Sequence, residues 1–457
     1  MRELPLFLLV IVALGCSSGC SSEEVGGDRD QHGSALVLEL TLRVPGTSTN
    51  GELGFRFGSP CDVNGDGVED VVAGARFTAR QFAGMGSVGV WSGDTGEKIV
   101  SWDGEVADGL FGQSVLAGPD VDGDGIADII AATPNGKYDD VYRGVVSARS
   151  AVTGAVLWRR VGEPYEVFGW DMAIASDQDG DGIDDLFVGA PRGDSKGHVY
   201  LLRGRDGVVL RTFQSAVPRD QFGWYVDAVP DLSGDGLVDL VVGAFAATCN
   251  GQPEVGAVYT FSSTSPQPLR VWHGYEARGL FGEVVAGIAD LDGDGCGDVV
   301  VGAPAKPTPV GGTASEDAEF AARATRAGDV YVYSGCTGEQ LFHFRGRGAG
   351  ELFGRMVASA GDVDGDGTDD VAIGAPWSRV GTYRRVGRVE IRSGQNGAVL
   401  ATIEGDRPEM WLGWHIARVR GRERGLLVSA LRKEECGKVG AGALHLYVVH
   451  HGTMMRR

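Results

Sequence analysis

Asp362-Val-Asp364-Gly-Asp366-Gly is the clearest copy of a motif that organises the chain. Five related segments align with it without a gap, and their first residues are Asp62, Asp120, Asp177, Asp231 and Asp290. A glycine lies eight residues before each first aspartate, and Gly-Ala-Pro or a variant lies twelve residues after it, as in Gly302-Ala-Pro and Gly374-Ala-Pro. Three landmarks that keep their distances over six copies indicate a structural repeat.

The residue before the recurring glycine is hydrophobic in every copy. It is phenylalanine in five of them: Phe111, Phe168, Phe222, Phe281 and Phe353. A seventh, degenerate copy begins at Leu412-Gly413-Trp414, but the segment 420–425 replaces its aspartate loop. The chain therefore contains seven repeat units.

Each repeat unit is predicted to form four β-strands. Short runs rich in β-branched residues, such as Asp298-Val-Val-Val and Asp329-Val-Tyr-Val-Tyr, alternate with glycine-containing turns. This pattern predicts an all-β, seven-bladed β-propeller with four-stranded antiparallel blades over residues 34–452. The seventh unit stops after its third strand, so we expect the N-terminal run at residues 35–43 to supply its outer strand and close the ring.

The combination of Phe-Gly, an aspartate loop and Gly-Ala-Pro resembles the FG-GAP repeat of the integrin α-subunit N-terminal β-propeller and its bacterial relatives. The resemblance covers nearly the whole chain after residue 34. It implies calcium in the loop between the first and second strands of a blade. It also implies a ligand on the opposite face. Six blades carry the loop here, whereas integrins carry it in only some blades.

The aspartate loops have the chemistry of a calcium site, because calcium takes six to eight oxygen ligands and alternate positions of a tight loop can converge on one ion. We expect positions 1, 3, 5 and 9 to give side-chain ligands and position 7 a carbonyl. The expected residues are Asp62, Asn64, Asp66, Val68 and Asp70; Asp120, Asp122, Asp124, Ile126 and Asp128; Asp177, Asp179, Asp181, Ile183 and Asp185; Asp231, Ser233, Asp235, Leu237 and Asp239; Asp290, Asp292, Asp294, Cys296 and Asp298; and Asp362, Asp364, Asp366, Thr368 and Asp370.

Two other kinds of loop have a similar sequence. An EF-hand needs glutamate at position 12, where these loops have alanine, valine or isoleucine. Asp-Gly turns also form without metal, but three or four carboxylates in one hairpin repel each other unless a cation is bound. We therefore expect up to six structural calcium ions, with weaker sites where Asn64 and Ser233 replace aspartate.

The N-terminus predicts export. Arg2 precedes a short apolar run, which indicates a signal peptide at residues 1–15. Cys16 follows glycine and is the expected lipidation site, with residues 16–33 as a flexible tether. The expected location is secreted or in the cell envelope, with a possible lipid anchor and no transmembrane helix. An exported chain can form disulfides, and Cys296 and Cys336 are the expected pair.

The sequence favours binding over catalysis. The formal net charge of -21 excludes nucleic acid as a natural partner, and the scattered histidines form no catalytic motif. The expected function is a binding, adhesion or scaffold module; a polysaccharide-active enzyme built on a propeller is the alternative. We expect a protein or glycan to bind exposed loop residues opposite the calcium loops. The candidates are Arg76, Phe77, Trp377, Arg379, Tyr383, Arg384 and Arg385. A short helix is also expected after Ser315.

Overall fold

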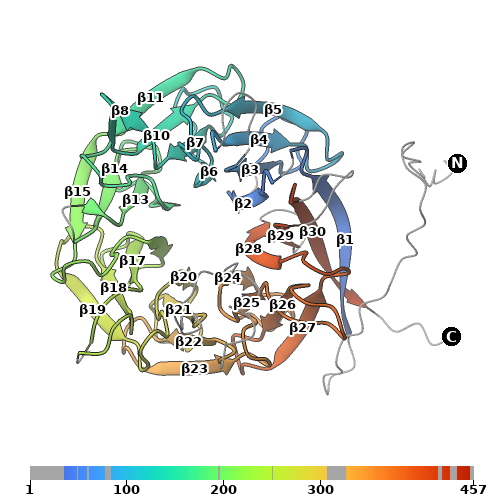
Figure 1. The fold of residues 1–457 in the computed structure, drawn as a ribbon. Coiled ribbons are helices and arrows are strands. Elements are labelled where there is room, and N and C mark those ends of the chain that lie inside the picture. The colour runs from blue at the N-terminus through green and yellow to red at the C-terminus, as the bar shows by residue number, and fades with distance from the viewer. Residues whose placement is uncertain are drawn as a thin grey trace, which may run out of the picture.

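The computed structural model describes residues 35–48, 50–58, 61–77, 84–193, 196–249, 251–305, 326–419, 425–432 and 440–452. Within these ranges the chain forms strands and no α-helix, and seven four-stranded sheets are arranged in a ring around a central axis (Figure 1). The seven-bladed propeller predicted from the repeats is confirmed.

Every blade is an antiparallel sheet whose first strand in the repeat lies innermost (Figure 1). The first three blades are β2 (Leu53–Phe57), β3 (Val71–Ala75), β4 (Ser87–Trp91) and β5 (Lys98–Asp103); β6 (Val115–Ala117), β7 (Ile129–Thr133), β10 (Val145–Arg149) and β11 (Val156–Val161); and β12 (Met172–Ile174), β13 (Leu186–Ala190), β14 (His198–Leu202) and β15 (Val209–Gln214). A small hairpin, β8 (Lys137–Tyr138) and β9 (Val141–Tyr142), extends the second blade.

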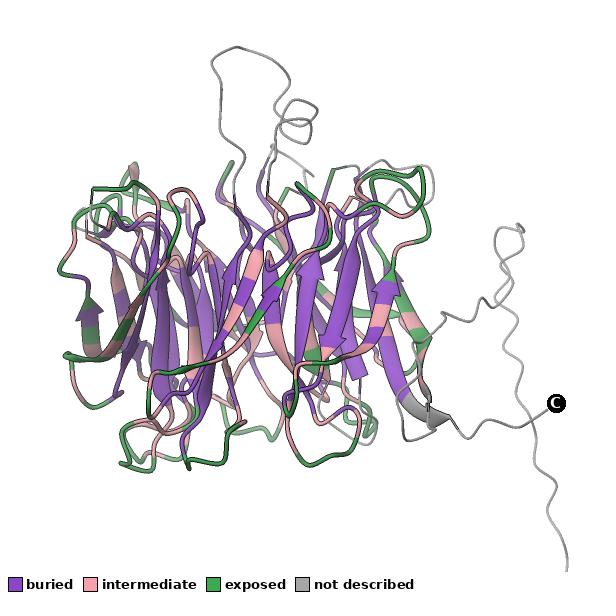
Figure 2. Ribbon diagram, turned by 90° about the horizontal axis from the view of Figure 1, so that it is seen from below, coloured by how far each residue is buried: buried purple, intermediate pink, exposed green. Residues whose placement is uncertain are grey.

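The next three blades repeat this order. They are β16 (Tyr225–Val229), β17 (Asp239–Ala244), β18 (Ala257–Phe261) and β19 (Pro268–His273); β20 (Val284–Ile288), β21 (Asp298–Ala303), β22 (Asp329–Tyr333) and β23 (Gln340–Arg345); and β24 (Met356–Gly361), β25 (Asp370–Ala375), β26 (Arg388–Arg392) and β27 (Val399–Glu404). The second strands are buried along their length, as their continuous apolar runs predict (Figure 2).

The seventh blade joins the two ends of the described chain. Its sheet order is β1 (Ala35–Pro45), β30 (Ala443–Gly452), β29 (Gly425–Ala430) and β28 (Leu412–Val419). β1 pairs antiparallel with β30 from Ala35 opposite Gly452 to Pro45 opposite Ala443. The predicted closure by a shared blade is therefore confirmed.

The two motif glycines set the approach between blades. The Gly282 amide donates to the Gly302 carbonyl of its own blade at 3.0 Å. A Cβ on Gly302 would lie 2.2 Å from the carbonyl oxygen of Gly354, the Phe-Gly glycine of the next blade. Gly354 has a φ of 81°, which glycine adopts without strain. A Cβ would clash at this contact, which explains why five of the six copies have glycine at this position, whereas the second blade has Ala132.

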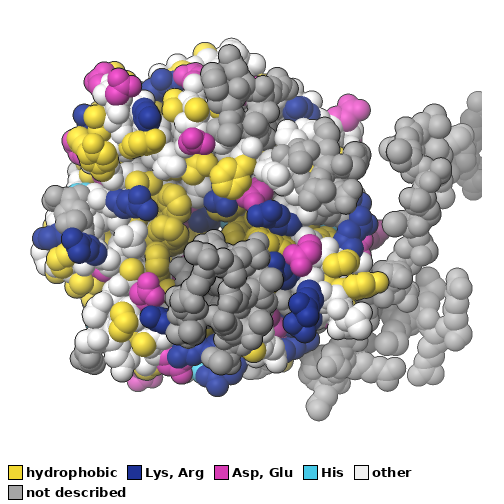
Figure 3. All heavy atoms as spheres, in the orientation of Figure 1, with side chains coloured by type: hydrophobic (Ala, Val, Ile, Leu, Met, Phe, Trp, Pro, Cys, Tyr) yellow, Lys and Arg dark blue, Asp and Glu magenta, His cyan; other side chains and the backbone are white. Residues whose placement is uncertain are grey.

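The antiparallel meander gives the propeller two faces. The aspartate loops join first to second strands and define the acidic-loop face. The loops between second and third strands, together with the connections that carry Phe-Gly, lie on the other face, called here the Phe-Gly face. Figure 3 looks along the channel at one face of the propeller, where Lys and Arg side chains gather around the central hollow.

Candidate functional site

The aspartate loop of the second blade shows how these segments curl. The Asp120 carboxylate accepts backbone N–H groups from Gly123 at 2.7 Å, Asp124 at 3.1 Å and Gly125 at 2.8 Å. Asp124 in turn accepts the N–H of Ile126 at 2.9 Å. The same bonds to the first aspartate recur in the third, fourth and fifth blades. The loop backbone therefore holds several carboxylates on one small surface.

The ninth-position aspartates have a second role that the sequence did not predict. Each is almost fully buried, and one of its oxygens accepts the N–H of loop position 2, as from Leu291 to Asp298 at 2.8 Å. The other oxygen accepts an N–H from the turn between the third and fourth strands, as from Gly335 to Asp298 at 3.0 Å. In the second blade, Asp128 Oδ1 makes no hydrogen bond of normal geometry within the described residues. The ninth aspartate thus ties two turns of one blade together.

Burial makes these carboxylates hard to ionise without a cation. Desolvation, assisted by neighbouring loop aspartates, raises the pKa of Asp128 and Asp185 to about 6. For the same reasons the pKa of Asp298 and Asp370 rises to about 7. A bound cation favours the ionised form and would relieve this penalty.

Four loops bring carboxylate oxygens close enough to share one ion. Oxygens from positions 1, 3 and 9 lie within 4.8 Å of one another in the second, third and sixth blades, and those from positions 1, 3 and 5 do so in the fifth. The described parts of the first and fourth blades form no such carboxylate triad, since Asn64 and Ser233 replace a carboxylate there. The oxygen-only donor set suits a hard cation such as calcium.

Neighbouring side chains distinguish the loops. In the third blade, Arg203 pairs with Asp179 at 2.8 Å and Arg205 pairs with Asp181 at 2.9 Å. In the fifth blade, the Ser334 hydroxyl donates to Asp294 at 2.8 Å. These partners all belong to the turn after the third strand, so that turn tunes the charge of the loop beside it.

The structure joins Cys296 and Cys336 by a disulfide, with Cα atoms 5.6 Å apart. Cys296 occupies position 7 of the fifth aspartate loop, and Cys336 lies in the turn between β22 and β23. The bond therefore ties this loop covalently to the same turn that its ninth aspartate contacts by hydrogen bonding.

On the Phe-Gly face, the residues expected to bind a partner fall into two groups. Phe77, Arg379, Tyr383 and Arg384 are exposed. The expectation of exposure is wrong for Arg76, Trp377 and Arg385, which are partly buried.

These three side chains are partly buried because they pack among aromatic rings and guanidinium groups. Trp377, Trp411 and Trp414 follow one another at centroid distances of 5.5 Å. The Arg385 guanidinium lies 4.4 Å from the Trp377 ring centroid. Arg76 lies 3.5 Å from the Phe55 ring centroid and also pairs with buried Glu52 at 3.1 Å. These side chains stabilise the face from within.

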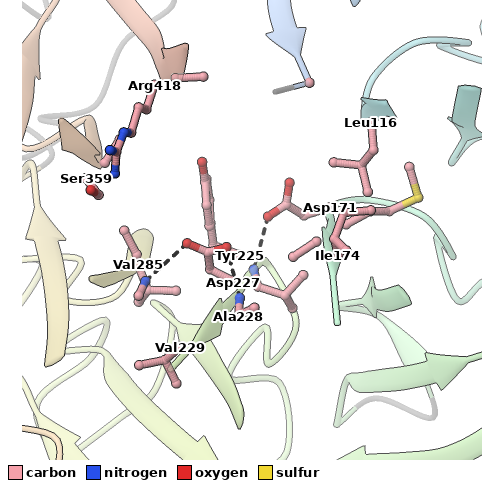
Figure 4. A pocket seen from close by; sticks show the side chains of 18 of the residues that line it. Leu116, Asp171, Ile174, Tyr225, Asp227, Ala228, Val229, Val285, Ser359 and Arg418 are labelled. Atoms are coloured by element: carbon pink, nitrogen blue, oxygen red, sulfur yellow. Dashed lines mark hydrogen bonds between the residues drawn. The ribbon is translucent and has the colours of Figure 1, made fainter. Parts of the chain in front are cut away.

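A cavity of about 650 Å³ occupies the central channel. Four of its polar lining residues are Arg56, Asp171, Tyr225 and His415, which come from four different blades. Arg56 donates to Tyr225 Oη at 2.5 Å and lies 3.2 Å from both Asp171 and His415 Nε2. Figure 4 shows the carboxylates of Asp171 and Asp227 beside Tyr225, with Arg418 and Ser359 across the channel.

Sequence reasoning missed this cluster, although a positional signal for it exists. All four residues stand two positions after the recurring glycine of their repeat, at Gly54, Gly169, Gly223 and Gly413. That position lies at or near the start of the innermost strand, and in six of the seven blades its residue lines the channel cavity: Arg56, Ser114, Asp171, Tyr225, Met356 and His415. The residue type varies from copy to copy, which hides the position in a search for repeated motifs.

Several expectations fall outside the described residues. The signal peptide, the tether with Cys16, and the helix expected after Ser315 are among them. The described part of the chain contains no helix of the length and hydropathy needed to cross a membrane.

Seven four-stranded blades, six of which carry an acidic loop between their first two strands, define the protein as a seven-bladed β-propeller. A sequence model of the FG-GAP repeat matches residues 111–148, 168–202 and 353–399. Three segments of the propeller, in its second, third and sixth blades, therefore match the FG-GAP repeat.

Integrin alpha subunits are among the curated relatives of this chain. Integrin alpha-5 of Xenopus laevis is 32% identical over 224 residues, which cover 46% of this chain and 20% of the relative. Integrin alpha-8 of Gallus gallus is 30% identical over 266 residues, covering 55% and 23%. The chain therefore matches about a fifth of the length of these integrin alpha homologues.

A solved structure shares the fold over most of the chain. The crystal structure titled as BBS1N in complex with ARL6DN, soaked with lead, has a TM-score of 0.54 and 9% identity, and the match covers 92% of this chain and 99% of that one. At this identity the likeness concerns the fold alone.

Proposed function

We propose that this propeller is a calcium-binding, extracytoplasmic binding module whose structural ions lie on one face and whose partner binds the other. The observation that carries the proposal is the convergence of three carboxylate oxygens within 4.8 Å in four separate loops. In those loops the first, third and fifth or ninth aspartates would hold each ion. Calcium would supply the positive charge that offsets their mutual repulsion.

The location rests on two features of the chain. The N-terminal sequence has the pattern of an export signal with Cys16 at its processing site. The disulfide between Cys296 and Cys336 is typical of proteins in oxidising compartments. A secreted or envelope-anchored propeller is consistent with both.

Binding is favoured over hydrolysis of a polysaccharide because the channel carboxylates already have partners. Asp171 is paired with Arg56 at 3.2 Å, and its other oxygen accepts the Val226 N–H at 3.0 Å. Asp227 accepts the N–H groups of Ala228 at 2.9 Å and Gly287 at 3.1 Å. Groups held in this way are poor candidates for an acid and base pair.

The partner site is proposed around the exposed residues Arg379, Tyr383 and Arg384 of the sixth blade and Phe77 of the first. Aromatic and arginine side chains on exposed loops are enriched in binding hot spots. The positive charge of Arg379 and Arg384 would attract an anionic glycan or an acidic protein to this acidic chain.

A glycan and protein array probed in calcium and in chelator tests the proposal. Tyr383→Ala and Arg384→Ala should weaken binding of an array ligand without lowering the melting temperature, since both side chains are exposed. Val152→Ala, at an exposed turn on the acidic-loop face, is the matched control. A different result would contradict this placement. If a folded Asp124→Ala variant loses binding while Tyr383→Ala and Arg384→Ala keep it, the partner binds the acidic-loop face.

A further inference from the structure

Three consecutive residues of the turn between β22 and β23 fasten the fifth aspartate loop. The Ser334 hydroxyl donates to Asp294 at loop position 5 over 2.8 Å. The next turn residue donates its backbone N–H to the aspartate at position 9 over 3.0 Å. Cys336, the third residue, is bonded covalently to Cys296 at position 7. The turn and the loop therefore move as one unit while the disulfide is intact.

The fourth blade has a similar arrangement without the covalent bond. Thr264 of its turn donates a hydroxyl hydrogen bond to Asp235 at position 5 over 3.0 Å. Thr264 stands where the fifth blade has Cys336, and Leu237 stands where it has Cys296. The fourth blade is therefore an internal reference for what the disulfide adds to the fifth.

The disulfide lies beside the carboxylates proposed to hold an ion. Oxygens of Asp290, Asp292 and Asp294 lie within 4.8 Å of one another, and an oxygen of Asp294 lies equally close to both sulfur atoms. Asp294 also accepts the N–H of Cys296 at 3.0 Å. In the second, third and sixth blades the converging oxygens come from positions 1, 3 and 9. Among the four converging loops, only the fifth uses the position 5 aspartate, and that aspartate is the one beside the disulfide.

A covalent restraint at this place favours ion binding for an entropic reason. A loop that is already ordered loses less conformational freedom when it closes around an ion. Reduction would release Cys296 and leave Asp294 tied to the turn by a hydrogen bond, as Asp235 is in the fourth blade. Because coupling between two equilibria is reciprocal, an ion that prefers the oxidised loop makes its disulfide harder to reduce by the same factor.

We propose that the Cys296–Cys336 disulfide and the calcium site of the fifth loop are coupled, so that reduction weakens calcium binding there and calcium protects the disulfide. The reductant is a dithiol, which gives two electrons and two protons to the two sulfur atoms and itself becomes a disulfide. The inference rests on the proposed function, because it concerns one of the proposed ions, and it makes that ion site sensitive to the redox state of its surroundings.

Equilibration of the full-length protein with mixtures of reduced and oxidised dithiothreitol tests the inference, once in calcium and once in chelator. Alkylation followed by peptide mass spectrometry measures the fraction of Cys296 and Cys336 that is reduced. Calcium should raise the ratio of reduced to oxidised dithiothreitol needed for half reduction about tenfold, a usual size for coupling between two sites. Measurement at equilibrium removes any effect of calcium on the rate of reduction.

Two matched substitutions locate the coupling. Asp292→Asn removes one proposed ligand of the fifth loop but keeps the oxygen that accepts the Asp294 N–H. Asn64 makes the same bond at position 3 of the first loop, so the change is compatible with the fold. This variant should reduce the calcium-dependent shift to less than about threefold, whereas Asp122→Asn, the same change in the second loop, should leave it near tenfold.

A second measurement approaches the coupling from the calcium side. Cys296→Leu combined with Cys336→Thr gives the fifth blade the residues of the fourth, Leu237 and Thr264, and so removes the disulfide while keeping a hydroxyl in the turn. Isothermal titration calorimetry should show one calcium site weakened about tenfold relative to the wild type. Melting curves check that each variant folds.

Three results would overturn the inference: a wild-type thiol–disulfide equilibrium that calcium leaves unchanged, a full shift in Asp292→Asn, or unaltered calcium affinities in the double cysteine variant. If calcium still raises the melting temperature in that case, the proposed calcium binding stands and only the coupling fails. If calcium changes neither the melting temperature nor the thiol–disulfide equilibrium, both proposals fail.

Discussion

The aspartate loops of the second and third blades have the same spacing but different electrostatic surroundings. In the third blade, Arg203 and Arg205 pair with the carboxylates at positions 3 and 5. The described residues show no such basic partner for Asp122 or Asp124 in the second blade, whose corresponding turn is Ser150-Ala-Val-Thr-Gly. The third loop therefore carries part of its own counter-charge, whereas the second would obtain its counter-charge from the proposed ion.

Removing calcium should have the largest effect of all. On the proposed function, each occupied site would stabilise the folded state by about 2.7 kcal/mol with calcium a hundredfold above its Kd. Because several loops would lose their ions together, we expect a large fall in the melting temperature in chelator. Calcium should restore it better than magnesium, which prefers a smaller octahedral site. Differential scanning calorimetry measures this, and unchanged melting in chelator would contradict it.

The fold was predictable because its signals lie close together in the sequence. The Phe-Gly and Gly-Ala-Pro glycines are required at fixed places by a backbone contact between blades, as between Gly302 and Gly354. The closing strand was recognisable from the missing fourth strand of the last repeat.

The electrostatic differences between sites were not predictable in the same way. Arg203 and Arg205 reach their loop from a turn 24 residues downstream, so their pairing depends on the register of two hairpins. The channel cluster takes one residue from each of four blades, as with Arg56 and His415, and only the closed ring brings them together. The seven partner candidates looked alike in sequence, but three pack into the face because aromatic rings and buried Glu52 lie beneath them.

The pH dependence in chelator should be the next largest effect. Desolvation raises the pKa of Asp128 and Asp185 to about 6, and that of Asp298 and Asp370 to about 7, from a usual value near 3.8. Such acids bind more protons when folded than when unfolded, so the free energy of unfolding falls as pH rises from about 4 to about 7. In chelator the melting temperature should therefore decrease from pH 5 to pH 8.

Calcium should reverse this trend, because on the proposed function it would bind the loops in their ionised form. The arginines of the third blade pair with positions 3 and 5 and do not contact the buried aspartate at position 9. Asp128→Asn and Asp185→Asn should therefore each remove a similar part of the dependence of the melting temperature on pH in chelator. A melting temperature in chelator that rises over this pH range would show that the ninth aspartates are ionised at little cost.

The disulfide should contribute less to the free energy of unfolding than the proposed calcium ions together. The disulfide between Cys296 and Cys336 links residues 40 apart, and such a bond stabilises a protein by about 2 to 4 kcal/mol. Cys336→Ser should lower the melting temperature with and without calcium, whereas Cys249→Ser, at a free cysteine, is the matched control. Unreduced peptide mass spectrometry verifies the bond, and equal melting of the two variants would argue against its structural role.

The smallest effect, and the one that tests the comparison directly, is expected from Arg203→Gln combined with Arg205→Gln. Without these guanidinium groups, the Asp179 and Asp181 carboxylates would repel each other more strongly in the ion-free loop, so the melting temperature in chelator should fall slightly. The same carboxylates would no longer be shared with arginine, so calcium should bind the third loop a few-fold more tightly and give a larger stabilisation. Both exposed pairs are screened by solvent, which keeps the change modest. Val152→Gln in the second blade, at a side chain that is exposed, is the control for altering the turn. If the arginine variant instead loses calcium affinity, the two residues organise the loop for the ion rather than replace part of its charge.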